Sequence, residues 1–176
     1  MNILGNQIIL RALELEDCEM LMNMINDPET EHMLGGWSFP VSKNAQLLWM
    51  ENLKNEKNVL RCIIEDANEK KAVGVVMLTD IDWKNGNAEI HIKLSPNGSR
   101  GKGYGTDSIC TLVKYSFDEL RLHTIYANVN SYNHASRRLF KKCGFEQEGV
   151  LRHRIYKKGK YEDVISFSRV NENFEE

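Results

Sequence analysis

The spacing of apolar residues changes along this chain and predicts both helices and strands. A short apolar strand is predicted over residues 7–13. Apolar residues then recur every three or four positions, as on one buried face of a helix, over 18–25 and again over 42–53. The period next falls to two, which is typical of half-buried strands. These strands are predicted over 59–65, 72–81 and 87–94.

The second half of the chain continues to alternate between helix and strand. The predicted elements are a helix over 109–120, a strand over 124–130, a helix over 134–143 and a hairpin of 145–156 with 161–170. The whole pattern predicts a single α+β domain over 1–176, with its core at about 7–170. We expect a mixed, mostly antiparallel central sheet of about seven strands, flanked by about four helices.

Composition and charge narrow the classes of function. The 176 residues are 41% hydrophobic and 27% charged, as in ordinary globular domains, and the net charge is −2. Such a chain has no overall attraction to nucleic acid or to an anionic membrane, and no apolar run approaches the roughly 18 residues of a spanning helix. The four cysteines are widely spaced, without a C-x-x-C pair, so we expect reduced thiols and no metal. No leader pattern opens the sequence, and a cytoplasmic location is expected.

A glycine-rich loop stands directly before the predicted helix over 109–120. The stretch SRGKGYGTDS holds Gly101, Gly103 and Gly105 at alternate positions. Glycines that lead into a helix let main-chain amides approach an anion, and the first helical turn adds unpaired donors. The spacing excludes two nucleotide-binding loops. A Walker A loop needs a lysine where Tyr104 stands, and a dinucleotide fingerprint needs unevenly spaced glycines.

Two signatures occur in order along the chain. The loop fits [QR]-x-x-G-x-[GA] from Arg100 to Gly105, and N-x-x-[AS]-x-x-x-[YF]-x-x-x-G-F runs from Asn133 to Phe145. The chain therefore resembles the GCN5-related N-acetyltransferases (GNAT). Its two ends look most like the branch of the ribosomal-protein N-terminal acetyltransferases and the spermidine acetyltransferases. The resemblance implies the GNAT fold and acetyl-CoA as the acetyl donor.

The resemblance also implies how the loop binds CoA. In the family, main-chain amides of the loop and of the helix N-terminus hold the pyrophosphate. The residues concerned here are Arg100, Gly101, Lys102, Gly103, Tyr104, Gly105 and Thr106. Tyr104 and Lys102 are expected to flank the phosphates. A Gly103→Val substitution is expected to place a Cβ where the pyrophosphate approaches.

The strand predicted over 87–94 carries the candidate base. Alternation puts Glu89, His91 and Lys93 on one face. The resemblance implies that this strand leaves its neighbour, so that main-chain groups of Ile92, Lys93 and Leu94 bind the pantetheine arm and one amide polarises the thioester. Glu89 is the first candidate for the base and His91 the second. The alternatives are a surface carboxylate in a cross-strand pair and a half-exposed strand histidine.

The second signature contains both a match and a departure. Asn133 resembles the family's CoA-contacting asparagine, and it would also cap the helix that begins at His134. Many family members have a tyrosine at the position of Phe140, as the acid that protonates the leaving thiolate. Phe140 has no proton to give, although it would still line the cofactor site. Ser136 is an alternative proton donor or relay, or else a helix-surface hydroxyl.

The acceptor is expected to be a primary amine: a protein N-terminus, a polyamine or another small amine. Trp37, between the first two predicted helices, and Glu89 are the candidate contacts with it. Self-association into a homodimer is a further expectation. The alternative function is a CoA-binding sensor or scaffold with weak or no catalysis, which Phe140 favours.

Overall fold

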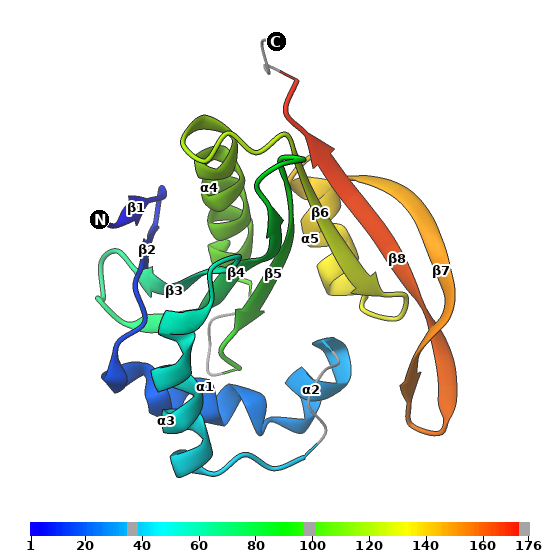
Figure 1. Cartoon of the computed structure of the whole chain (residues 1–176). Coiled ribbons are helices and arrows are strands. Elements are labelled where there is room, and N and C mark those ends of the chain that lie inside the picture. The colour runs from blue at the N-terminus through cyan, green and yellow to red at the C-terminus, as the bar shows by residue number, and fades with distance from the viewer. Residues whose placement is uncertain (35–38, 97–100, 173–176) are drawn as a thin grey trace.

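Eight strands form one sheet in the computed structural model, which describes residues 1–34, 39–96 and 101–172 (Figure 1). Their spatial order is β1-β2-β3-β4-β5-β6-β8-β7, and the neighbours are antiparallel except for the parallel pair β5–β6. The strands are β1 (Ile3–Leu4), β2 (Ile8–Arg11), β3 (Leu60–Asp66), β4 (Ala72–Asp82), β5 (Asn87–Leu94), β6 (Thr124–Asn130), β7 (Glu146–Lys157) and β8 (Lys160–Val170). The mixed, mostly antiparallel sheet is confirmed. Strand β1 was not expected.

The described residues include five α-helices, one more than the sequence pattern predicts. They are α1 (Cys18–Ile25), α2 (Pro28–Leu34), α3 (Lys43–Asn52), α4 (Tyr104–Asp118) and α5 (His134–Lys142), with 3-10 turns η1 (Leu15–Asp17) and η2 (Leu53–Asn55). Helix α2 is the addition, because Asp27-Pro28 begins a new helix as well as ending the previous one. Proline fits the first helical position, and the Asp27 carboxylate accepts a hydrogen bond from Thr30 N at 2.8 Å.

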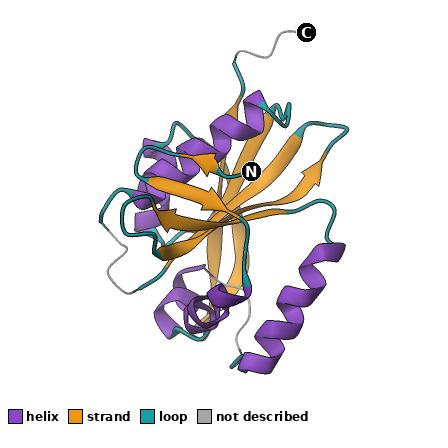
Figure 2. Cartoon of the chain, turned by 90° about the vertical axis from the view of Figure 1, so that its left-hand side faces the viewer, coloured by secondary structure: helices purple, strands orange, loops and turns teal. Residues whose placement is uncertain are grey.

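The alternation along the strands divides the core between the two faces of the sheet. On one face, Leu112 of α4 packs in a cluster with Val76 of β4. On the other face, Met24 of α1 packs with Val75. Figure 2 accordingly shows helices on both sides of the strands. Because Val75 pairs with Lys93, the face covered by α1 also carries the odd-numbered residues of β5.

Strands β5 and β6 diverge in the middle of the sheet. They pair only from Asn87 with Thr124 to Glu89 with Tyr126. Beyond Glu89, β5 keeps its partner β4 as far as Leu94, whereas β6 continues with β8 (Figure 1). The main chain of β5 therefore has no β6 partner from Ile90 onward. This confirms the expectation that the strand over 87–94 leaves its neighbour.

Candidate functional site

The N-terminal segment contacts the glycine loop through Gln7. Gly103 precedes α4 with φ +87°, a left-handed conformation that favours glycine. Gln7 Nε2 donates a hydrogen bond to the carbonyl of Lys102 at 3.1 Å. A Cβ added at Gly103 would lie 2.7 Å from Gln7 Nε2. Backbone conformation and Gln7 therefore already favour a glycine here, and the approach of the pyrophosphate to this position stays a prediction.

Gly101 has a different environment. Its φ is +78°, and among the described residues no atom lies within 4 Å of a Cβ built there. Lys102 is exposed beside it. The open side of the loop thus begins at Gly101 and Lys102. Arg100, the first residue of the motif, lies outside the described residues.

The side chain of Tyr104 points into the protein. It is buried, and its hydroxyl donates a hydrogen bond to the Asp66 carboxylate at the end of β3. That bond, together with burial, raises the pKa of Tyr104 to about 12. The expectation that Tyr104 flanks the phosphates is therefore corrected to its main-chain amide, because the ring and hydroxyl are committed to the core.

Asp107, in the first turn of α4, also has a structural use that the sequence pattern did not predict. It is buried, and it accepts from the amides of Asn6 at 3.1 Å and Gln7 at 2.7 Å. The carboxylate thus fastens the β1–β2 turn to the helix. Gly103 itself supplies no side-chain cap to α4. The amides that open α4 can therefore meet an external anion, as the first turn of a helix allows.

Two small positions let α4 lie close to its neighbours. A Cβ at Gly105 would be 3.4 Å from Leu139 of α5 and 3.6 Å from Leu94 of β5. Thr106 is half-buried, and its carbonyl accepts from Cys143 Sγ at 3.9 Å. The loop, the end of β5 and α5 consequently meet at one place.

The divergence of β5 and β6 opens into a cavity of about 300 Å³. Described side chains from five elements line it, and they include six of the predicted site residues. The predicted residues are His91, Ile92, Lys93, Asn133, Ser136 and Phe140. Leu94 belongs to the same strand but does not line the cavity. Trp37 lies outside the described residues.

Glu89 and His91 lie close together at the point of divergence, and each hydrogen-bonds to a side chain of a neighbouring strand. Glu89 Oε1 accepts from Asn128 Nδ2 at 3.0 Å, and Glu89 Oε2 lies 3.7 Å from His91 Nε2. His91 Nε2 is also 2.9 Å from Thr79 Oγ1. Burial lowers the pKa of His91, and this outweighs the opposing effect of the Glu89 charge. His91 is therefore a neutral imidazole at neutral pH, able to accept a proton.

The residues that support Glu89 and His91 are only weakly indicated by the sequence pattern. Asn128 occupies the same face of β6 as Tyr126 and Asn130, so the polar alternation in TIYANVN is its only signal. Thr79 pairs with Glu89 across β4 and β5. Neither residue could be assigned a partner before the register of the strands was known.

Asn133 confirms its capping role. It is buried, and its Oδ1 accepts from Ser136 N at 3.1 Å at the start of α5. Its Nδ2 donates to the carbonyl of Met33 at 3.1 Å, and Asn130 Nδ2 donates to the same carbonyl at 3.0 Å. These bonds fasten the end of α2 beside the cavity. A contact between Asn133 and CoA stays a prediction. To donate to CoA, Asn133 Nδ2 would give up its hydrogen bond to the Met33 carbonyl.

Phe140 is an apolar wall of the cavity. It is 3% exposed, with Phe145 edge-on at 5.1 Å and Phe167 stacked at 6.4 Å between ring centroids. Ser136 lines the same cavity and is half-buried. Within the described part of the chain, no group hydrogen-bonds to the Ser136 hydroxyl. Of these two side chains, only Ser136 can donate a proton.

Residues 1–34, 39–96 and 101–172 contain no group of three or more His, Cys, Asp or Glu side chains that could hold a metal ion. Within the same ranges, no helix has the length and apolarity needed to cross a membrane.

Comparison with known proteins assigns the chain to a family. The acetyltransferase (GNAT) domain profile matches residues 7–146. The SPbeta prophage-derived N-acetyltransferase YokL of Bacillus subtilis is 33% identical, covering 97% of this chain and 94% of that protein. Spermidine N(1)-acetyltransferase of Vibrio cholerae is 32% identical, covering 92% and 91%.

The fold is also found in a solved structure. Spermidine N-acetyltransferase from Vibrio cholerae, in complex with CoA and spermine, superposes with a TM-score of 0.85 at 29% identity, over 94% of this chain and 96% of that one. The profile match and the relatives agree with both sequence signatures. The chain belongs to the GNAT acetyltransferases.

Proposed function

We propose that the protein transfers the acetyl group of acetyl-CoA to a primary amine, by direct attack in a ternary complex. The divergence of β5 and β6 immediately after Glu89 carries this proposal. It leaves β5 main chain unpaired at one side of a cavity that His91 lines, with Glu89 3.7 Å from His91 and the first turn of α4 close to Leu94 at the end of β5. The CoA and spermine bound by the related Vibrio cholerae enzyme support the same use of the site.

The donor would be held by main-chain groups. Amides from Gly101 to Thr106 suit the pyrophosphate, because the open side of the loop faces away from Gln7 and Tyr104. Unpaired main-chain groups of Ile92 to Leu94 suit the amides of the pantetheine arm. One of these N–H groups would donate to the thioester oxygen and stabilise its developing negative charge.

The chemistry needs one proton removed and one supplied. The amine nitrogen attacks the acetyl carbonyl carbon, the C–N bond forms and the C–S bond breaks. Glu89 would take the amine proton through water, with His91 as the second candidate 3.7 Å away. The CoA thiolate gains a proton from Ser136 or from water, because Phe140 offers none. The products are the N-acetyl amine and CoA thiol.

The same cavity also fits a second function. A CoA-binding sensor or scaffold would keep the loop and lose catalysis, and the apolar Phe140 wall is the observation that favours it. Mixing protein, acetyl-CoA and a panel of amines while following free thiol separates the two functions. Release of thiol that depends on the amine supports the transferase. Binding of acetyl-CoA without turnover on any amine supports the module, and absence of CoA binding refutes both.

Assembly and location stay predictions. We expect a homodimer, and light scattering of the purified protein measures its mass directly. Fractionation of cells that produce the protein tests the predicted cytoplasmic location.

A further inference from the structure

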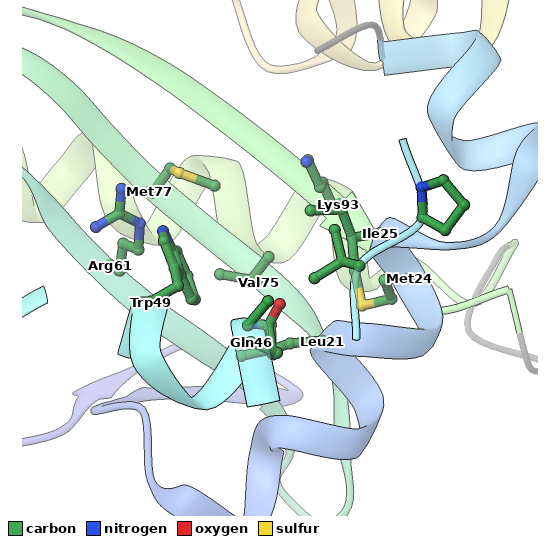
Figure 3. A pocket seen from close by; sticks show the side chains of 12 residues that line it. Leu21, Met24, Ile25, Gln46, Trp49, Arg61, Val75, Met77 and Lys93 are labelled. Carbon is green, nitrogen blue, oxygen red and sulfur yellow. The ribbon is translucent and has the colours of Figure 1, made fainter. Parts of the chain in front are cut away.

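A second cavity adjoins the transfer site on the face of the sheet covered by α1 and α3. Its volume is about 480 Å³, within the range of roughly 300–1,000 Å³ typical of small-molecule sites. Its walls are mainly apolar, from α1, α3 and strands β3 to β5 (Figure 3). The side chains that matter for ligand chemistry are Trp49, Val75, Met77, Gln46, Arg61 and Lys93. None of the described residues that line it is acidic.

This cavity shares two lining residues with the transfer site. Met77 and Lys93 line both cavities. Met77 pairs with His91 across β4 and β5, and Val75 pairs with Lys93. Lys93 is therefore two residues along the same face from the candidate base His91. The Lys93 side chain therefore lies between the apolar cavity and the point where β5 leaves β6.

The ammonium group of Lys93 has no counter-ion among the described residues. No carboxylate in the described part of the chain lies within 4.0 Å of its ammonium group, and it has no hydrogen-bond partner there. Burial lowers the pKa of Lys93, because an ammonium group without a counter-ion is costly away from water. A ligand carboxylate at this position would remove that cost and gain a charge-assisted hydrogen bond.

Arg61 adds a second cationic group at the other side. Its guanidinium lies 5.3 Å from the ring centroid of Trp49, and Glu56 accepts from Nη1. Arg61 Nε is buried, and none of the described residues hydrogen-bonds to it. Figure 3 shows Arg61 and Trp49 together on one side of the cavity and Lys93 on the other, with Val75 between them. An apolar group would thus lie over Val75 and Met77 and end against Trp49.

We infer that the acceptor is an amine that carries a carboxylate and an apolar group on the same carbon, that is, a free apolar α-amino acid. Its carboxylate binds Lys93, its side chain fills the apolar cavity, and its amine lies beside Glu89 and His91. A polyamine is a poor fit here, because its positive charges would face Lys93 and Arg61. This inference rests on the proposed transfer to amines and specifies its substrate. The amine–acetyl bond forms, the thioester C–S bond breaks, the amine loses one proton and the CoA thiolate gains one.

Turnover on matched amines tests the inference. Phenylalanine, phenylalaninamide, phenethylamine and spermidine are compared by thiol release with acetyl-CoA. We expect kcat/KM for phenylalanine to exceed that for phenylalaninamide and phenethylamine by about tenfold or more, as loss of a hydrogen bond to a charged group implies. Lys93→Met should abolish that preference, whereas Lys84→Met, on the exposed β4–β5 turn, should retain it. Equal or better turnover of spermidine or the amide by the unmodified protein overturns the inference and leaves the proposed function intact.

Binding provides a readout that does not need turnover. Calorimetry on the protein–CoA complex should show phenylalanine binding about tenfold or more tightly than phenylalaninamide, with the difference lost in Lys93→Met. Ala45→Phe, at an exposed α3 position on the cavity wall, should block phenylalanine binding by filling the cavity. If no amine is acetylated but this binding pattern holds, the proposed function fails and the cavity assignment stands. Phenylalanine binding that ignores both substitutions overturns the assignment.

Discussion

Replacing Gly103 should weaken CoA binding through the protein's own backbone. A side chain in the left-handed conformation costs about 1–2 kcal/mol, and Gly103 has φ +87°. A valine Cβ would lie 2.7 Å from Gln7 Nε2, so Gln7 must move and give up its bond to Lys102, at a further cost of about 1 kcal/mol. If the loop of the unbound variant relaxes to an unstrained conformation, acetyl-CoA can bind only after the loop returns to the strained one. The free energy of that return is lost from the binding. The resulting loss of about 2–3 kcal/mol corresponds to roughly 30- to 150-fold in affinity.

Calorimetric titration of acetyl-CoA measures this loss, and urea unfolding checks that the fold survives. Gly159→Val is the matched control, because it has φ +84° and no described atom within 4 Å of its Cβ, and it lies in the turn between β7 and β8, outside the glycine loop. It should leave the acetyl-CoA affinity unchanged. In a Gln7→Ala background, the loss caused by Gly103→Val should shrink to the backbone cost alone, roughly 5- to 30-fold. Unchanged acetyl-CoA affinity in Gly103→Val would refute the reasoning.

Three further outcomes are expected. Glu89→Gln should lower kcat about 10²- to 10⁴-fold with little change in acetyl-CoA affinity, and the exposed Glu69→Gln should match the unmodified protein; equal kcat values would assign the base elsewhere. Ser136→Ala should lower kcat about 10- to 100-fold if its hydroxyl supplies the thiolate proton, and an unchanged kcat would leave that step to water. The stability that Tyr104 gains from Asp66 should be present below about pH 10 and lost towards about pH 12, since its pKa is raised from 10.0 to about 12. Urea unfolding of Tyr104→Phe should lack that loss, and an identical profile would contradict the bond.

Local spacing was sufficient to predict the loop and the cap. The alternating glycines, the helix after them and Asn133 before His134 are all neighbours in sequence, so their geometry follows from local backbone preferences. Alternation along β5 likewise predicted which side chains share a face, because a strand has a period of two. The two motifs formed by such neighbours carry the resemblance to the family, and that resemblance implies the acetyl donor.

Two short elements escaped prediction for the same physical reason. Strand β1 covers Ile3–Leu4, and α2 covers Pro28–Leu34. Segments of this length contain too few repeats of the apolar period to be recognised, and tertiary contacts stabilise them. Contacts far along the chain, such as Met33 with Asn133, hold α2 in place.

Only the tertiary structure decided where the site side chains lie. Spacing in the sequence allowed Tyr104 to face the phosphates, yet burial against Asp66 turned its ring inward. The bond between Gln7 and Lys102 joins positions 95 residues apart, which no local rule can pair. The cavity beside Lys93 likewise exists only because α1 and α3 cover the face of β5 that alternation had identified. The sequence identified the acetyl donor through a family resemblance that two local motifs carry, whereas the chemistry of the acceptor depends on side chains that folding alone brings together.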